Sequence, residues 1–473
     1  MRRALTVTAV LLAAALAEAG DAPLALGTLR IQAFVEPPRM PPIPITQGPL
    51  QEIIDTIVPE DVRPLAHAWE LELDRHRRLL RAAEDALDEL DGYYAHQIVL
   101  RANEAGALRE LGTRERTALE ERFARENDER VSSLRSREAG IVSLFAAGDG
   151  AAGPPSAAGH LLLAEIRFAQ YEDTYRTLLA RWRQEQRAFL AGERADPPIR
   201  PRPYLDPVVR ALEVVRGMAA DRLTRERTMQ LLAVVRVALD DHAGAAAALH
   251  DVLKGGASWI LDAELKNRSG DALLALGRYA GAARAYGSVT EASGTWLVRA
   301  RLGLAWARHR MGDDDGALAA TIEVRRRLEG LFEQSATALT AEADRLYAQL
   351  LADRSGPLPA DAPPRVLDSA QALRARATTL LEGDGSDDRA EAVRDRVPEV
   401  RRCYRRLLLD APGSHGRLLL LLPPRGRPTL DAAGFGDARF KACLDGALKT
   451  VMSPAGAPPG LLVLELSSEA PAR

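Results

Sequence analysis

The sequence lacks the charge excess and the long apolar runs that mark nucleic-acid-binding and membrane-embedded proteins. Its 63 basic and 66 acidic side chains leave a formal net charge of −3, which gives no electrostatic drive toward nucleic acid. After the first stretch of the chain, no apolar run approaches the roughly 20 residues of a transmembrane helix. Apolar residues still make up 47% of the 473 residues, enough for the cores of roughly two to four domains.

Sequence motifs of catalysis and metal binding are also missing. There is no G-x-S-x-G and no P-loop, and the eight histidines are scattered, with no third ligand near His242 and His250. Gly148 to Gly153 match a dinucleotide-binding pattern by letter, but they follow a predicted helix and run into two prolines. We therefore expect no catalytic residue, no cofactor and no metal site. An enzyme whose site is assembled from distant residues stays open as an alternative.

The first residues predict a secretory signal peptide. Arg2 and Arg3 precede the apolar run Val7–Ala17, and a small-x-small cleavage pattern ends at Ala19. About 12 apolar residues at 1.5 Å each reach about 18 Å, too short for a bilayer core of about 30 Å. We expect residues 1–19 to be removed after Ala19, which leaves a periplasmic or secreted protein without an integral membrane segment. An uncleaved anchor is the alternative.

Proline content marks two segments as linkers on either side of a helical region. Six prolines lie from Pro37 to Pro49, and they predict that residues 20–64 form an extended spacer. A plain tether is the simpler interpretation, and a recognition strand for a partner is the alternative. Within residues 65–190, the pattern from Leu65 to Phe145 predicts two or three long antiparallel helices, paired in the manner of a coiled coil, and His160–Leu190 predict another long helix. Residues 191–207 form the second proline-rich linker.

Residues 208–354 contain an internal repeat. Three stretches share one pattern, in which Asp240, Gly277 and Gly312 align about 36 residues apart. In each copy a first helix ends at this turn, and a second helix opens with small residues that let it approach the first. One such hairpin cannot bury its own apolar face, so stacked copies are expected to share a continuous core.

These copies resemble tetratricopeptide repeats, and the middle copy fits best. The outer copies are degenerate, since Ala305 stands where the first helix usually has glycine and Thr321 replaces an aromatic residue. The resemblance implies an α-solenoid whose concave face binds peptides or protein segments. The residues that carry the signature are Gly270, Gly277, Tyr279, Ala282, Tyr286, Gly312 and Ala317.

The end of the chain, residues 366–473, follows a Pro/Gly linker at 355–365 and predicts a small α+β module. Short apolar runs at Leu418–Leu422 and Leu461–Leu466 are bounded by Pro and Gly, which suits buried strands better than helices. An amphipathic helix precedes each run, and a further strand is expected around Thr429–Ala432. The predicted fold class is mainly α, with helical hairpins and a tetratricopeptide-like α-solenoid followed by a small α+β domain.

Several features of this module carry a second resemblance. They are Cys403-Tyr404, Asp410–Gly413, the strand after Gly416, and Phe440–Cys443 with its helix. Together they resemble the carboxy-terminal domain of the myxobacterial gliding-motility proteins AgmX and PglI, a relative of the TonB carboxy-terminal domain. The family's Gly-x-Val tail on the strand hairpin is replaced here by prolines between Pro423 and Pro428. Because proline cannot donate to a strand ladder, the hairpin is predicted to lie at a sheet edge.

Export changes the meaning of the two cysteines of the chain. In an oxidising compartment, Cys403 and Cys443 in one small module predict a disulfide, whereas in the cytosol they would be core thiols. A closed loop of about 40 residues would stabilise the module by about 4 kcal/mol in the chain-entropy model.

These predictions together indicate an exported, non-enzymatic scaffold or adaptor that binds proteins of the bacterial cell envelope. The resemblance implies a gliding-motility or other envelope-spanning complex, and a TonB-like energy transducer with a retained anchor is the alternative. TonB-type domains bind by offering a strand edge, so the closing strand is the candidate docking strand, with simple burial weighed equally. Its residues are Leu461, Leu462, Val463, Leu464, Glu465 and Leu466.

Overall fold

The chain divides into two compact units, and one is inserted into the sequence of the other. The terminal unit consists of Met1–Pro42 and Gly277–Arg473, and the inserted unit of Ile43–Leu276. The boundary at Leu276 therefore lies inside residues 208–354, the segment predicted as one repeat array. The computed structural model describes residues 23–33, 38–41, 43, 45–147, 156–190, 192–290, 294–329, 334–354, 357–382, 388–411, 413–423, 427–431, 435–451 and 457–468. The predicted signal peptide, residues 1–19, lies outside them.

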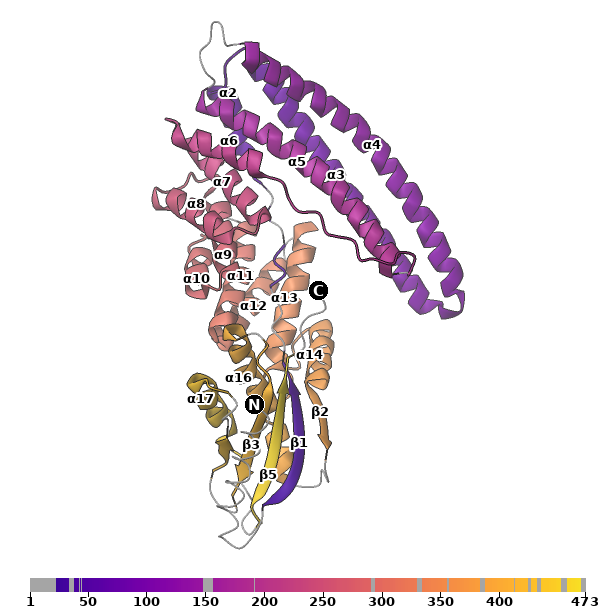
Figure 1. Cartoon of the computed structure of the whole chain (residues 1–473), viewed down its shortest axis with the longest axis vertical. Coiled ribbons are helices and arrows are strands. Elements are labelled where there is room, and N and C mark those ends of the chain that lie inside the picture. The colour runs from indigo at the N-terminus through magenta and orange to yellow at the C-terminus, as the bar shows by residue number, and fades with distance from the viewer. Residues whose placement is uncertain are drawn as a thin grey trace. The chain divides into compact units, whose positions relative to one another are not determined.

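The inserted unit is helical throughout its regular elements. Its long helices α3 and α4 pack along each other and are joined by the single turn η1 (Figure 1). Helices α6 to α9, which are shorter, are joined to one another by short turns, as expected for helical hairpins. The elements are α2 (Gly48–Thr56), α3 (Arg63–Leu100), η1 (Ala102–Glu104), α4 (Ala105–Ala147), α5 (Ala157–Leu190), α6 (Asp206–Gly217), α7 (Arg222–Ala238), α8 (His242–Lys254) and α9 (Asp262–Ala275).

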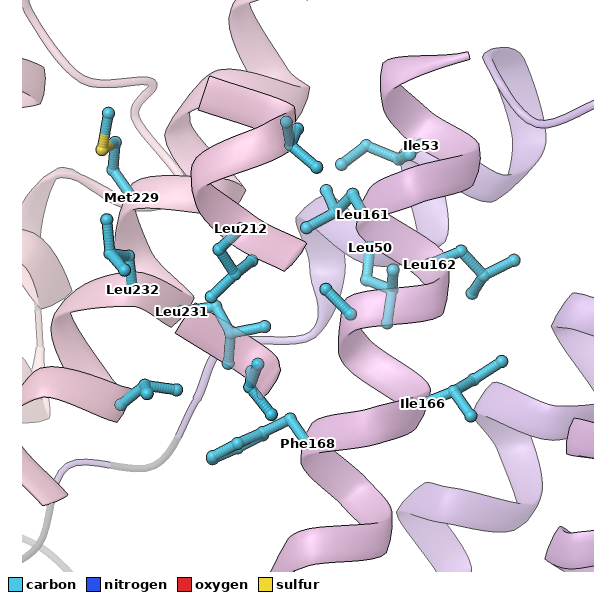
Figure 2. Packing of buried hydrophobic residues seen from close by; sticks show 14 of the residues in the cluster. Leu50, Ile53, Leu161, Leu162, Ile166, Phe168, Leu212, Met229, Leu231 and Leu232 are labelled. Carbon is cyan, nitrogen blue, oxygen red and sulfur yellow. The ribbon is translucent and has the colours of Figure 1, made fainter. Parts of the chain in front are cut away.

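The core of the inserted unit forms where α2, α5, α6 and α7 meet (Figure 2). Leu50 and Ile53 of α2 lie among Leu161 of α5, Leu212 of α6 and Leu231 of α7, and each of these side chains is 1% exposed or less. Burying one such side chain contributes about 1.5–3 kcal/mol. Helix α2 is therefore an integral part of this core.

The terminal unit combines further helical hairpins with one sheet. Helices α11 to α14 pack successively, and the sheet follows them in sequence except for its strand β1. The predicted fold class, mainly α with a small α+β domain after the helical hairpins, is confirmed (Figure 1). The elements are β1 (Leu24–Gln32), α10 (Tyr279–Gly287), α11 (Thr295–Met311), α12 (Asp314–Leu328), α13 (Gln334–Ala352), α14 (Pro364–Ala377), β2 (Thr378–Glu382), α15 (Asp388–Arg394), α16 (Val397–Asp410), β3 (Gly416–Leu422), β4 (Thr429–Asp431), α17 (Ala438–Leu448) and β5 (Gly460–Ser467).

The sheet has the strand order β2-β1-β5-β3-β4 and mixes parallel and antiparallel pairs. Strand β1 runs parallel to β5, with Leu29 opposite Leu464, while β3 runs antiparallel to β5. Alternate residues of these strands point to one face, because side chains alternate along a strand. That face packs against α16 and α17, where Tyr404 and Leu444 are fully buried. The result is a two-layer α/β domain.

Two predictions about the strands are wrong, and both concern β1. Residues 20–64 are not an extended spacer, because Leu24–Gln32 form β1 and Gly48–Thr56 form α2. The alternating apolar residues of β1 supply an apolar face that an extended tether would leave exposed to water. Strand β5, which contains the predicted docking strand Leu461–Leu466, pairs with β1 on one side and β3 on the other. It is an interior strand, so burial in the sheet, the alternative weighed for it, agrees with the structure, and docking through its free edge does not.

The strand hairpin behaves as predicted from its prolines. Strand β4, Thr429–Asp431, is short and lies at the edge of the sheet, where it pairs only with β3 among the described strands. Its position agrees with the expected strand around Thr429–Ala432, of which Ala432 lies outside the described residues.

Candidate functional site

A short stretch of the chain outside any helix or strand, residues 38–41, is held by charged side chains of the terminal unit. The main-chain N–H of Arg39 donates to Glu342 Oε1 of α13 at 2.7 Å. The carbonyl of Pro41 accepts from Arg299 Nη2 of α11 at 2.8 Å. Glu342 and Arg299 are 4% and 5% exposed, and Arg345 fixes the Glu342 carboxylate from 2.8 Å. Both contacts are made to main-chain atoms, so they do not depend on the side chains of the stretch.

Ile43 and Thr46 are held in the same manner by side chains of the inserted unit. The N–H of Thr46 donates to Glu264 Oε2 of α9 at 3.0 Å. The carbonyl of Thr46 accepts from Arg227 Nη1 of α7 at 2.7 Å, and that of Ile43 accepts from Arg268 at 3.2 Å. Arg227 and Glu264 are both fully buried. Here again arginines bind carbonyls and a glutamate binds an amide.

The side chains that bind Thr46 are locked by a buried network. Arg227 Nε lies 2.5 Å from Glu165 Oε1 of α5, and Gln230 accepts from Arg227 at 2.8 Å. The amide of Gln230 in turn donates to Glu264 Oε1 at 2.7 Å. Buried charges are tolerated when they are paired and their hydrogen-bonding groups are satisfied. The network therefore holds the binding groups in place in advance.

Five of these side chains make hydrogen bonds directly to main-chain atoms of Arg39, Pro41, Ile43 or Thr46, and we call them the main-chain clamp. The clamp has a separate part in each unit: one part lies on α7 and α9 of the inserted unit, and the other on α11 and α13 of the terminal unit. Extended proline-containing segments have few amide donors, so binding them through carbonyls and the remaining N–H groups uses what they offer. The clamp residues are Arg227, Glu264, Arg268, Arg299 and Glu342.

The turns of the predicted repeats have one shared geometry. Asp240, Gly277 and Gly312, the aligned positions, have φ values of 63°, 70° and 84°. Asp240 is the one non-glycine with positive φ among the described residues. The left-handed region favours glycine, which explains why two of the copies have it at this position.

The other signature residues occupy the packing positions that the pattern predicts. Ala282 and Ala317 are fully buried at the starts of α10 and α12, and Gly270 is buried in α9. Tyr286 is fully buried, and its ring lies where a side chain on Gly303 of α11 would stand. Tyr279 is half-buried at the start of α10. Helices α7 and α8, and helices α11 and α12, pack against each other as repeat hairpins.

The two cysteines meet beneath the sheet. The Sγ atoms of Cys403 on α16 and Cys443 on α17 lie 2.06 Å apart, the distance of a disulfide bond. The pair matches the predicted bond and links the two helices that cover one face of the sheet. Tyr404 donates from its hydroxyl to the carbonyl of Ser414, which ties α16 to the chain leading into β3.

Helix α16 also docks the sheet domain onto the helical hairpins. Arg401 donates to the carbonyl of Ala352 at 2.6 Å, and Arg406 donates to that of Gly312 at 2.7 Å. Arg405 forms a buried ion pair with Asp353. These contacts are short-range and largely buried, so the predicted linker at residues 355–365 does not separate two independent bodies.

Two arginines of α16, Arg402 and Arg406, lie near the carboxyl group of Asp314 at the start of α12 and affect its pKa. Burial alone would raise the pKa of the Asp314 carboxyl. The hydrogen bond from His309 at 2.8 Å and the guanidinium groups of Arg406 and Arg402 outweigh burial and lower that pKa. The carboxylate thus stays ionised between the repeats and α16.

Within the described part of the chain, no three His, Cys, Asp or Glu side chains come together in a way that could hold a metal ion. No helix in the same described ranges has both the length and the apolar character needed to cross a membrane. The predicted absence of catalytic residues and cofactors stays a prediction.

Sequence reasoning missed the main-chain clamp. Arg227 and Glu264 resemble ordinary helix-surface charges, since each has opposite charges within four residues along its own helix. A usable signal was present in α7, where Arg227 is followed closely by the apolar run from Leu231 to Val235. A charge beside such a run is buried only if it is paired.

Comparison of the chain with protein-family models, with curated proteins and with solved structures gave no match.

Proposed function

We propose that this protein is a non-enzymatic interaction scaffold whose helical hairpins bind extended, proline-containing segments through their main chain. The observation that carries the proposal is the main-chain clamp, which holds Arg39 and Pro41 in the terminal unit, and Ile43 and Thr46 in the inserted unit. Buried, pre-paired arginines and glutamates lose little conformational entropy on binding, since they are fixed before the segment arrives. A proline-containing segment is also extended in advance.

The location of the scaffold is proposed on separate grounds. A disulfide between Cys403 and Cys443 is compatible with an oxidising compartment such as the periplasm. The resemblance to AgmX and PglI supports a place in an envelope-spanning complex, and its partners would be proteins of the cell envelope. In this proposal the sheet domain does not dock through β5, which is interior.

The proposal is tested by removing the bound segment from the chain and supplying it as a separate peptide. In one variant, residues 38–47 are replaced by a Gly/Ser linker of equal length, and circular dichroism and thermal unfolding check that it folds. A fluorescent peptide with the sequence of residues 38–47 is then titrated and followed by anisotropy. We expect saturable binding to the variant and little binding to the wild-type chain, whose clamp is already occupied.

The matched control is the same peptide with N-methyl groups on the amides of Arg39 and Thr46. This peptide keeps every side chain but loses the two N–H groups that Glu342 and Glu264 accept. We expect its affinity to fall by at least tenfold, because two buried carboxylates lose a hydrogen-bond donor. A folded variant that binds neither peptide, or binds both equally, would contradict the proposal.

A further inference from the structure

The terminal unit contains a cavity of about 750 Å³ whose wall is dominated by arginine. It lies where the end of α13, α14, the loop between α15 and α16, and the end of α17 come together. Among the described residues that line it, five are arginines and a single one, Asp395, is acidic. The arginines are Arg354, Arg374, Arg394, Arg396 and Arg401.

The deep side of the cavity carries more positive than negative charge. Arg401 Nε lies 3.3 Å from Asp353 Oδ1, but the same carboxylate also pairs with Arg405. Two buried guanidinium groups therefore share one carboxylate, and Arg374 stands close enough to repel Arg401. Burial lowers the pKa of Arg401 to about 10, Asp353 opposes this effect, and Arg405 and Arg374 add to it. Arg401 also donates to the carbonyls of Leu373 and Ala352, so its own donors are engaged within the protein, and what it offers an anion in the cavity is its positive charge.

The arginines at the mouth of the cavity have partners that they can exchange. Arg396 lies 3.3 Å from Glu399 on the same helical stretch, and Arg354 pairs with Asp315, which is 85% exposed on its side chain. Exposed ion pairs contribute only about 0–1 kcal/mol, so either arginine can turn to a stronger acceptor at small cost. The mouth thus supplies donors that can turn toward an anion, next to the fixed positive charge of Arg401.

We infer that this cavity binds a small, multiply charged oxyanion, carrying phosphate or carboxylate groups. Guanidinium groups bind both kinds of group through paired N–H donors, and five arginines line this cavity. The volume falls in the range of small-molecule sites, about 300–1,000 Å³, and exceeds what a single phosphate fills. Val397, Pro398 and Val451 give the remaining wall an apolar character that suits the carbon frame of such a molecule.

Calorimetric titration of the full chain at low ionic strength tests this inference, with pyrophosphate, citrate and inorganic phosphate as probes. We expect pyrophosphate or citrate to bind with at least tenfold higher affinity than inorganic phosphate and to raise the melting temperature, because a ligand of the folded state stabilises it. Stronger binding of pyrophosphate identifies a phosphate site, and stronger binding of citrate identifies a carboxylate site. No binding of any probe at millimolar concentration overturns the inference.

Two variants and a control place the bound ion. Arg394→Gln and Arg396→Gln each remove one half-buried guanidinium from the lining, whereas Arg439→Gln removes an exposed one on α17 outside it. We expect each lining variant to weaken binding by about tenfold or more, equal to about 1.4 kcal/mol, and the control to leave it unchanged. Equal losses in all three would show binding by overall charge and would contradict a built site.

Discussion

The residues at the N-caps of the second repeat helices share one backbone conformation, but only two of the three add a side-chain hydrogen bond to it. Asp241, Arg278 and Asp313 have ψ values of 67°, 59° and 70° at the N-caps of α8, α10 and α12. The two aspartates accept from the amides of Gly244 and Gly316, three residues on. Arg278 makes no side-chain cap of this kind, so α10 lacks a contact that its neighbours have.

Replacing Arg278 by aspartate should therefore stabilise the protein. The chain offers Gly281 at the third position, as in the other two copies, and an N-cap aspartate contributes about 1 kcal/mol. We expect Arg278→Asp to raise the free energy of unfolding of the terminal unit by about this amount in urea titrations. Asp313→Ala is the matched control and should lower it similarly. A loss in the control without a gain in Arg278→Asp would show that the α10 turn cannot accept the cap.

Replacing a glycine by alanine adds a methyl group, and Gly303 and Gly92 differ in the atoms that this group would contact. A Cβ on Gly303 would lie 2.4 Å from Cζ of the buried Tyr286 ring, which has no room to move. A Cβ on Gly92, inside α3, meets nothing within 4 Å. We expect Gly303→Ala to cost about 1–3 kcal/mol through overpacking and Gly92→Ala to stabilise by up to about 1 kcal/mol through helix propensity. Thermal unfolding of both variants decides, and equal effects would contradict the packing of Tyr286.

At the scale of single elements, strand β1 is fixed on its solvent side by charge as well as by its apolar face. Glu465 of β5 accepts from Arg30 of β1 at 3.0 Å and from Arg417 of β3 at 3.1 Å. These hydrogen bonds, that from Arg30 first, lower the pKa of Glu465 below its ordinary value of 4.5. One carboxylate thus bridges three neighbouring strands.

This bridge makes a small, pH-dependent contribution to stability. Because the folded state lowers the pKa, the contribution is present above about pH 4.5 and is lost as the pH falls through the folded value. We expect Glu465→Gln to lower the stability of the terminal unit by about 0.5 kcal/mol near neutral pH, and we expect this difference from the wild type to shrink as the pH falls toward 3. Melting temperatures of both proteins between pH 3 and 7 test this. The exposed Glu60→Gln serves as control, and a difference that is constant across this range would contradict the prediction.

The elements that depend on local sequence could be predicted, and those that depend on distant partners could not. The turns at Gly277 and Gly312 follow from glycine and spacing, and the cysteine pair follows from its confinement to one module. Strand β1 has the alternating pattern of a strand, yet nothing local shows that Leu29 lies opposite Leu464. Arg227 likewise looks like any helix charge until Glu165 and Thr46 are seen beside it.

At the scale of the whole molecule, the strand order ties together segments from opposite ends of the sequence. Strand β1 is separated from β5 by the whole inserted unit and by the helices of the terminal unit. Such a contact closes a very long loop, and non-local pairing of this kind slows folding. The sheet is complete only when β1 has paired with β5. Because β1 is far from the other strands in sequence, it can be removed from the chain and supplied as a separate peptide.

The final prediction uses this separability. A variant in which residues 24–32 are replaced by a Gly/Ser linker loses the buried side chains Leu26, Leu29 and Ile31, each with a transfer free energy of about 1.5–3 kcal/mol. We expect a lower melting temperature and faster amide exchange in β5. A synthetic peptide of residues 23–33 should restore both in a concentration-dependent manner, because it binds only the folded sheet. A control peptide with aspartate at positions 29 and 31 should not restore them, since charges would enter the apolar face. Wild-type stability in the linker variant would show that β1 contributes little, and equal rescue by both peptides would show that the pairing does not depend on the buried side chains of Leu29 and Ile31.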